Sequence, residues 1–220
     1  MRQQCLATDN YYHILNRSIA KFNIFNNDIE FQRILDTFVY YRQLNPPLRF
    51  SWFYEQSKKK LIDQIDNDNL VDILCYCLMP THFHLILKQN IDDGISKYMS
   101  KVENSYTRYF NIKHKRKGPL WESRFKNILV ETDEQMLHLT RYIHLNPVSA
   151  GIVSKPQYWQ FSSYHEYIDK KIKADNFKIS NYEDVIDIQP KIYKDFVNER
   201  IDDQKDLSII KKYLLENYTG

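Results

Sequence analysis

The stretch Leu70–Lys88, LVDILCYCLMPTHFHLILK, decides the fold of this chain. Two apolar runs within it, Leu70–Leu78 and Phe83–Lys88, have the length and the aliphatic content of buried strands. They lie on either side of Met79-Pro80-Thr81, and a short gap that contains a proline is typical of a tight hairpin. The stretch therefore predicts two consecutive strands that pair with each other.

Outward from this hairpin, the sequence predicts two further strands and three helices. Apolar residues recur at helical spacing from Asp28, which can act as an N-cap, to about Gln43. The other predicted elements are a first strand at Asn10–Arg17, a helix at Ile91–Ile112, a strand at Phe125–Glu131, and a helix that Thr132 caps and that Asn146-Pro147 ends.

The order of these elements is β-α-β-β-α-β, with one helix added at the end. This order is typical of a ferredoxin-like α+β sandwich with an antiparallel sheet. Polar, helical segments at Lys191–Arg200 and Leu207–Tyr218 predict a helical C-terminal tail. We therefore expect a catalytic domain over residues 1–168 and a helical extension over residues 169–220. The fold alone does not identify the chemistry, because many functions share it.

The composition is that of an ordinary globular protein, since 43% of the 220 residues are hydrophobic and 27% are charged. No apolar run is long enough to span a membrane, and the first residues, Met1–Cys5, lack the core of a signal peptide. Three cysteines fit a reducing compartment better than a disulfide framework. The sequence therefore predicts a cytoplasmic protein with no membrane partner.

Positive charge is concentrated in one short block, although the net charge of the chain is only +3. Between Lys113 and Lys126, the sequence has six lysine and arginine residues and a single acid, Glu122. Such a block is often a solvated loop, but it can also contact the phosphates of a nucleic acid. Its charge alone leaves both interpretations open.

A pair of histidines, His82 and His84, stands at the second strand of the hairpin. Side chains two residues apart leave the same face of a strand, so both imidazoles point together and Phe83 points the other way. Paired imidazoles can bind a divalent metal. The alternative is two half-exposed histidines on a sheet face. Cys75 and Cys77 could complete a zinc site with the pair, but they lie in an apolar run where thiols usually behave as buried hydrophobes.

Tyr142 and Asn146 lie four residues apart in the last predicted helix, so they stack on one helical face. A phenol beside an amide oxygen suits a tyrosine that attacks a phosphate while the amide completes a metal shell. The alternative is that Tyr142 packs and that Asn146 is simply the last residue before the proline. Tyr106 and Tyr109 compete as nucleophiles, but both fall within the apolar stripe of their helix, which favours packing.

Four ordered segments carry a resemblance to a known family. The run Tyr76–Leu87 resembles the HUH hairpin of the single-tyrosine, or insertion-sequence-200-like, transposases, and it is most similar to their REP-associated branch. The other matching segments, which extend with WQFSSYHEY to Tyr167, are YYHILNRS from Tyr11, GPLWESRFKNILVE from Gly118, and RYIHLNPVSAGIV from Arg141. Four motifs in order are specific, whereas a lone HxH is not.

The resemblance implies a role for individual residues. His82 and His84 match the metal-binding pair of the family, Tyr142 matches its nucleophile, and Asn146 falls where members place a third, polar metal ligand. Members cleave single-stranded DNA near hairpins with Mg²⁺ or Mn²⁺, which implies strand transfer through a 5′-phosphotyrosine. The rival functions are hairpin binding without cleavage and hydrolysis by a metal phosphodiesterase. Since members of the wider family act as monomers or as dimers, a monomer and a homodimer both remain open.

Single-stranded or hairpin DNA is therefore the expected partner of the basic block. Trp121 could stack on an unpaired base, or it could be a core tryptophan. His13 and His144 are given no functional role and are expected to be structural or exposed to solvent. The residues expected to contact the DNA backbone are Arg116, Lys117, Arg124 and Lys126, with Asn16 and Arg17 as weaker candidates.

Overall fold

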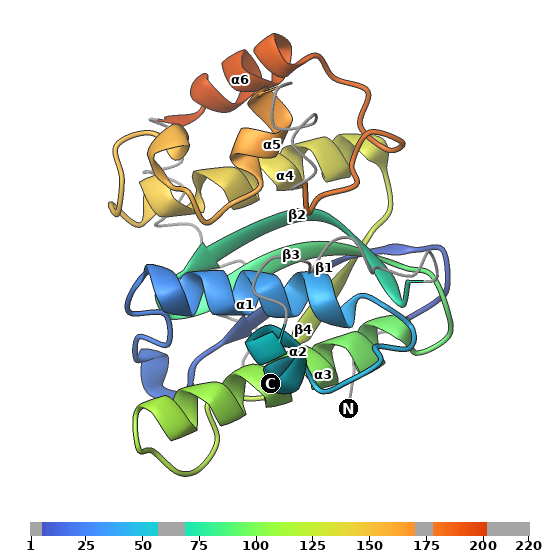
Figure 1. Ribbon diagram of the computed structural model, residues 1–220. Coiled ribbons are helices and arrows are strands. Elements are labelled where there is room, and N and C mark those ends of the chain that lie inside the picture. Colours follow the sequence, from blue (N-terminus) through green and yellow to red (C-terminus); the bar gives the residue numbers. More distant parts are fainter. Residues whose placement is uncertain (1–5, 57–68, 170–177, 202–220) are drawn as a thin grey trace.

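The computed structural model describes residues 6–56, 69–169 and 178–201. Within these ranges, four strands form one antiparallel sheet in the order β2-β3-β1-β4 (Figure 1). This order is the one that the β-α-β-β-α-β pattern requires, so the predicted ferredoxin-like α+β fold is confirmed. The strands are β1 (Tyr11–Arg17), β2 (Val71–Met79), β3 (His82–Gln89) and β4 (Lys126–Val130).

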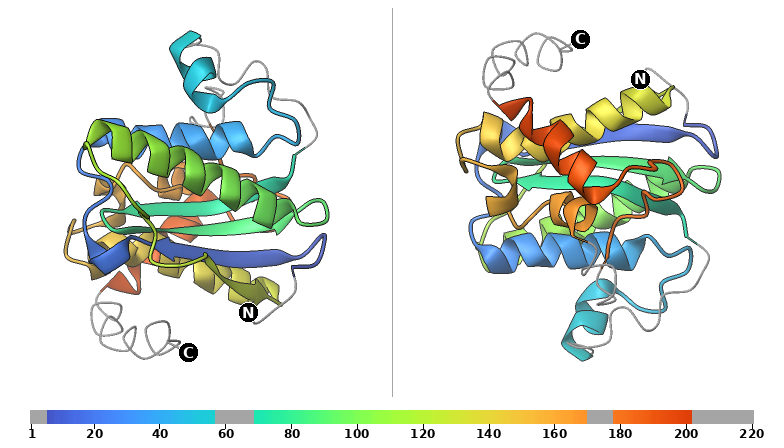
Figure 2. Two further views of the ribbon diagram at one scale, coloured as in Figure 1. Left: turned by 90° about the horizontal axis from the view of Figure 1, so that it is seen from below. Right: turned by 90° about the horizontal axis from the view of Figure 1, so that it is seen from above.

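Helices cover both faces of the sheet. Helices α1 and α3 lie on one face, and α4, α5 and α6 lie on the other (Figures 1 and 2). None of the helices in the described ranges is long and apolar enough to cross a membrane. The helices are α1 (Asp28–Tyr41), α2 (Phe50–Gln56), α3 (Gly94–Lys113), α4 (Asp133–Ser149), α5 (Tyr164–Ile168) and α6 (Pro190–Asn198), with short 3₁₀ turns η1 (Ile19–Lys21) and η2 (Pro156–Tyr158).

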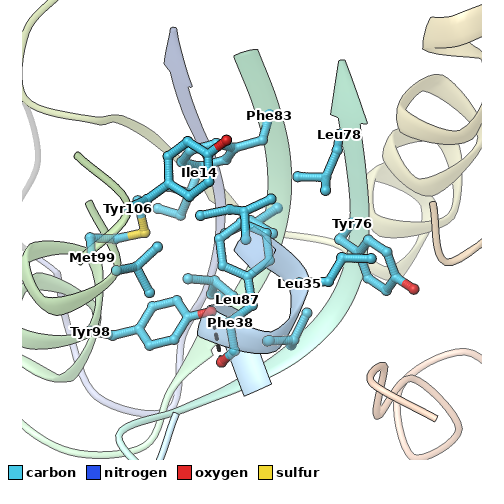
Figure 3. Close-up of a cluster of buried hydrophobic side chains, with 14 of the residues drawn as sticks. Ile14, Leu35, Phe38, Tyr76, Leu78, Phe83, Leu87, Tyr98, Met99 and Tyr106 are labelled. Atoms are coloured by element: carbon cyan, nitrogen blue, oxygen red, sulfur yellow. Dashed lines mark hydrogen bonds between the residues drawn. The ribbon is translucent and has the colours of Figure 1, made fainter. Parts of the chain in front are cut away.

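The main core lies between the sheet and the α1–α3 layer. Ile14 of β1 and Phe83 of β3 are fully buried on this face of the sheet. Phe38 of α1 and Tyr98 of α3 close over them, as Figure 3 shows. The apolar stripes predicted for these two helices therefore face the sheet, because residues three and four apart share one side of a helix.

A second core lies on the opposite face of the sheet. Cys77 of β2 and Ile86 of β3 contribute to it from the strands, and Ile143 of α4 and Tyr193 of α6 contribute from the covering helices. Because strand side chains alternate, His84 belongs to the same face as Ile86. This layer therefore places helix α4 over the face of the sheet that carries the histidine pair (Figure 1).

Helix α4 corrects one sequence prediction, because it continues through Asn146 and Pro147 to Ser149. A proline inside a helix has no N–H to donate to the carbonyl four residues earlier, which here is that of Ile143. The side-chain amide of Asn146 supplies a donor instead, since its Nδ2 lies 3.4 Å from that carbonyl oxygen and 3.1 Å from the carbonyl oxygen of Tyr142. The Asn-Pro pair therefore does not end this helix.

Three other segments add to the sequence prediction. Helix α2 lies in a polar stretch to which the sequence assigned no element, and Phe50 and Phe53 pack it against Tyr40 of α1. The SSYHEY segment, to which the sequence assigned no helix, contributes its last four residues to α5. The predicted tail helix at Lys191–Arg200 corresponds to α6, whereas Leu207–Tyr218 lies outside the described residues.

Candidate active site

The β2–β3 hairpin presents the two histidines to the α4 side of the sheet. His82 pairs with Met79 across the turn and with Arg17 of β1 on its other side. His84 pairs with Cys77 and is almost fully buried, with 3% of its surface exposed. The two imidazole centroids lie 5.1 Å apart, with the rings nearly perpendicular at 81°. The predicted same-face arrangement of the pair is therefore present.

A hydrogen bond anchors Nδ1 of each ring. The Thr81 hydroxyl lies 2.9 Å from Nδ1 of His82, and Nε2 of His13 lies 3.0 Å from Nδ1 of His84. When one imidazole nitrogen is held in this way, the other becomes the atom that can bind a metal. The donor set therefore fits a divalent cation that takes Nε2 of both rings and completes its shell with oxygen ligands.

His13 is a member of the site that the sequence analysis missed. Its ring stacks on that of His84, with centroids 5.2 Å apart and planes 19° from parallel. Burial lowers the pKa of His13 to about 4, so the ring is neutral at pH 7 and its Nε2 can accept a hydrogen bond. The signal was the alternation of β1, in which His13 shares a face with Leu15, the partner of His84. The alternation shows that His13 lies near His84 only once the pairing of β1 with β3 is known.

Tyr142 lies beside the histidines of its own chain. Helix α4 begins where the Thr132 side chain accepts a hydrogen bond from the Gln135 amide, as predicted. Ten residues further on, the Tyr142 ring meets His84 edge-on at 5.9 Å between centroids and lies 6.4 Å from that of His13. The side chain is half-buried, and burial raises the pKa of its phenol to about 12. At neutral pH the phenol is therefore protonated.

Asn146 follows one turn after Tyr142 and is buried. Its amide nitrogen is directed at helix carbonyls, so its amide oxygen is the atom that could bind a metal. No three His, Cys, Asp or Glu residues in the described ranges gather into a metal-binding group. A cation at the histidine pair would therefore need oxygen ligands such as this amide, water or a phosphate.

The alternative zinc site built from Cys75 and Cys77 is wrong for the described residues, which contain no such group. Both thiols are fully buried, and burial raises the pKa of Cys75. Cys75 Sγ lies 3.3 Å from Nε2 of His144 rather than beside the histidine pair. His144 is a core residue, because its side chain is fully buried. Its ring nitrogens lie 2.7 Å from the hydroxyls of Tyr193 and Ser163.

The competing nucleophiles Tyr106 and Tyr109 belong to the other layer of the molecule. Both lie on α3, which covers the face of the sheet opposite to α4 (Figure 2). The Tyr106 hydroxyl is buried and donates to the Ile24 carbonyl at 2.6 Å. The Tyr109 ring packs beside the Arg33 guanidinium, 5.1 Å away. The packing interpretation of these two tyrosines is therefore favoured.

Four of the expected DNA-contacting residues stay candidates, since two lie on strands beside the histidines and two are exposed in the connection between α3 and β4. Arg17 lies opposite His82 in the sheet and pairs with Glu122 at 2.5 Å. Lys126 of β4 is opposite Leu15 on the same face. Lys117 and Arg124 are exposed and have no ion-pair partner among the described residues.

The other three expected contacts are engaged inside the fold. Arg116 donates to the Pro119 carbonyl at 2.6 Å and so holds its own loop. Trp121 packs on Phe83 at 5.4 Å, which favours its interpretation as a core residue. Asn16 is buried and donates to the Glu103 carboxylate at 2.7 Å, so direct contact with DNA is disfavoured.

Comparison with known proteins finds a matching family model, a related sequence and a solved structure of similar fold. A family model described as "Transposase IS200 like" matches residues 7–146, a range that includes both histidines, Tyr142 and Asn146. A Haemophilus influenzae protein named as a REP-associated tyrosine transposase is 24% identical over 116 residues. That alignment covers 48% of this chain and 66% of the relative, slightly less than two thirds of its length.

A solved structure of a REP-associated tyrosine transposase bound to a REP hairpin has a similar fold. It matches with a TM-score of 0.57, and the match covers 86% of this chain and 94% of that one. The sequence identity is 16%, so this likeness shows that the two chains share a fold.

Proposed function

Because this chain belongs to the IS200-like transposase family, we propose that it cuts single-stranded DNA beside a hairpin and transfers the cut strand through Tyr142. The observation that supports this proposal most directly is the 5.9 Å separation between the rings of Tyr142 and His84 of the same chain. Hairpin DNA is the proposed substrate because the solved structure of similar fold is bound to a REP hairpin.

The proposed reaction exchanges one phosphodiester bond for another. The phenol oxygen of Tyr142 attacks the scissile phosphorus, and the bond from phosphorus to the 3′-oxygen breaks. The phenol gives up its proton, and the leaving 3′-oxygen takes one up. The products are a 5′-phosphotyrosine and a 3′-hydroxyl end. A 3′-hydroxyl of another strand can then attack the phosphotyrosine and release the phenol, so no ATP is needed.

The chain holds three candidate ligands for a divalent cation, Mg²⁺ or Mn²⁺, namely Nε2 of His82, Nε2 of His84 and the amide oxygen of Asn146. When bound there, the cation would neutralise charge on a non-bridging phosphate oxygen. His13 and Thr81 orient the two rings, and α4 holds Tyr142 beside them. The raised pKa of the Tyr142 phenol means that attack at neutral pH needs such a polarised target.

Basic side chains around this face are proposed to hold the DNA backbone. Arg17 lies next to the histidine pair, and Lys126 lies on the neighbouring strand. Lys117 and Arg124 are exposed at the connection between α3 and β4. Because each phosphate contact displaces a counterion, binding through these residues should weaken as salt concentration rises.

A covalent-adduct assay tests the proposal. The full chain is incubated with a 3′-labelled single-stranded hairpin oligonucleotide and Mn²⁺, and the products are separated on a denaturing gel. The wild-type chain should give a slow band of protein joined to DNA, and Tyr142→Phe should abolish it. The matched control is Tyr109→Phe, which removes a hydroxyl in the opposite layer but keeps the aromatic ring, and it should retain the band.

Each other result of the assay has a definite meaning. Free cut ends without an adduct would indicate hydrolysis, and a mobility shift without cutting would indicate a DNA-binding protein. An adduct that survives in Tyr142→Phe would overturn the nucleophile assignment. Since imidazole ligands suit Mn²⁺ better than Mg²⁺, adduct yield should be higher with Mn²⁺ in matched titrations. Equal or lower yield would count against His82 and His84 as ligands.

A further inference from the structure

A second concave site lies in the layer opposite to Tyr142. A cavity of about 750 Å³ opens between α1, α2 and α3. Its size lies within the range of small-molecule pockets, which is about 300–1,000 Å³. The views in Figure 2 show α3 on one face of the sheet and α4 on the other, so this cavity is separate from the histidine site.

The cavity is lined by positive charge. Five of its lining residues are cations, and none of the lining residues in the described part of the chain is acidic: Arg33, Arg49, Lys101, Arg108 and Lys113. Outside the lining, Glu30 pairs with Lys113 at 2.8 Å and with His114 at 2.6 Å, and Asp36 lies close enough to Arg33 to interact with it electrostatically. Lys101 is half-buried and has no oppositely charged partner among the described residues. Such a group attracts an anion, because burial without a counter-charge disfavours its charged form.

Two further cations stand near Lys101. Arg108 lies seven residues further along α3, so it projects from nearly the same side of the helix. Arg49 immediately precedes α2. Both side chains are exposed, and within the described ranges neither has an ion-pair partner. Three cations directed at one cavity without acids among them are the arrangement that binds phosphate.

Aromatic rings form the other wall of the cavity. The Arg33 guanidinium lies 4.3 Å from the ring centroids of both Phe50 and Tyr54, and this contact fixes α2 beside the cavity. Tyr54 and Tyr109 both line the cavity and are half-buried, so part of each ring remains accessible. Arg33 lies over one face of each ring, and the parts that remain exposed beside the cations offer a packing surface for a base of any sequence.

We propose that this cavity binds a nucleotide, with the phosphate on Lys101, Arg108 and Arg49 and the base against Tyr54 and Tyr109. The same chemistry could come from a free nucleotide or from an unpaired nucleotide of a DNA strand. The second source rests on the proposed function, because it assumes that single-stranded DNA is the substrate. Packing of Arg33 between the rings does not account for the other three cations, which lack acidic partners.

The test uses two lysines on the same helix. Lys101 lines the cavity, whereas Lys97, one turn earlier, is exposed and lies outside it. Each is changed to glutamine in the full chain carrying Tyr142→Phe, so that binding is measured without strand cutting. Fluorescence anisotropy with a labelled single-stranded oligonucleotide should show an increase in Kd of about tenfold for Lys101→Gln, the loss expected for one charge-assisted contact. Lys97→Gln should change Kd less than about twofold, as an exposed charge outside the site.

Competition distinguishes the two sources. If dAMP displaces the oligonucleotide from the parent, and its own binding is lost in Lys101→Gln, the cavity takes a free nucleotide. If only unlabelled oligonucleotide competes, the cavity takes a nucleotide of the strand. Equal effects of Lys97→Gln and Lys101→Gln on both ligands would overturn the proposal. Melting temperatures of both variants should match that of the parent.

Failure of this proposal and failure of the proposed function give different results. A chain that binds dAMP through Lys101 but never forms the covalent adduct would remove the strand-transfer proposal and keep this site. A chain that forms the adduct, and whose Kd for both ligands is unchanged by Lys101→Gln, would remove this site and keep the strand-transfer proposal.

Discussion

At the scale of single residues, the orientation of His84 depends on one partner. His13 reaches across from β1 to hold Nδ1, and so decides which nitrogen of His84 can face a cation. The HxH spacing predicted that His82 and His84 share a face, because strand alternation is a local rule. It could not predict His13, which lies 71 residues away in the chain. Such partners depend on strand pairing, which the local pattern does not determine.

A prediction at this scale concerns the affinity for Mn²⁺. Removing the ring in His13→Ala should weaken Mn²⁺ binding by about 10- to 100-fold, the usual effect of losing a partner that orients a metal-binding histidine. Isothermal titration of the protein without DNA measures this directly. His13→Gln should recover part of the loss, because its amide oxygen can still accept from Nδ1 of His84.

His138 provides the matched control, because it is an exposed histidine on α4 whose ring lies beside Arg141 and Phe196 rather than beside His84. His138→Ala should leave the Mn²⁺ affinity unchanged. If His13→Ala and wild type bind Mn²⁺ equally, His13 does not position His84 for a metal.

At the scale of elements, one helix start of three was predicted correctly, because α1 is capped by Asn27 rather than Asp28 and α3 begins at Gly94 rather than Ile91. The Thr132 cap was predicted correctly, because capping needs only one side chain and the amides just after it. The end of α4 was misplaced, because proline normally stops a helix and the compensating donor lies in the preceding side chain. Helix α2 was missed, because the aromatic cluster that stabilises it comes from a different helix.

The pairing of Asn146 with Pro147 leads to a double-mutant prediction. Asn146→Ala removes the side-chain donor to the Ile143 carbonyl and should lower the free energy of unfolding by about 1–3 kcal/mol, the usual cost of an unsatisfied buried acceptor. In the double variant, Pro147→Ala gives the backbone back the N–H that the same carbonyl needs. Adding this second change should therefore recover part of the loss.

Urea unfolding of the wild type, the two single variants and the double variant gives the coupling energy between these positions. Additive effects would show that Asn146 does not compensate for the proline. The covalent-adduct assay on the same four proteins separates this structural role of Asn146 from its proposed role as a ligand, because Pro147→Ala restores only the backbone.

At the scale of the whole molecule, two cores lie on the two faces of one sheet. The order of the elements predicted the fold, because only a few topologies accommodate β-α-β-β-α-β. The order of the elements did not predict which face of the sheet the helices after β4 cover, because the local sequence of a helix does not determine this. In the structure, α6 contributes Tyr193 and Val197 to the core beneath α4. The division at residue 168, and the role of residues 169–220, stay predictions.

The packing of α6 predicts that it stabilises the layer that carries Tyr142. Tyr193 is fully buried and its hydroxyl lies 2.7 Å from Nδ1 of His144. Tyr193→Ala should therefore lower the free energy of unfolding by about 3–5 kcal/mol, as large aromatic truncations in a core do. Urea denaturation, monitored by circular dichroism, would measure the loss as a lower urea midpoint of one cooperative unfolding transition.

Ile192 is the adjacent residue on the same helix and is 59% exposed. Ile192→Ala should change stability by less than about 0.5 kcal/mol, as substitutions at the surface usually do. A Tyr193→Ala protein that matches this control, or that melts in two separate steps, would show that α6 is not part of the α4 layer.

The histidine pair stays on the α4 side of the sheet only because the chain between Met79 and His82 has its present length. One residue inserted there would reverse the parity of every later position in β3 relative to β2. Phe83 would then be turned out toward α4, and both imidazoles would be pressed into hydrocarbon beneath α1. The length of this short turn thus decides which of the two cores receives the imidazoles, and therefore whether they face Tyr142 at all.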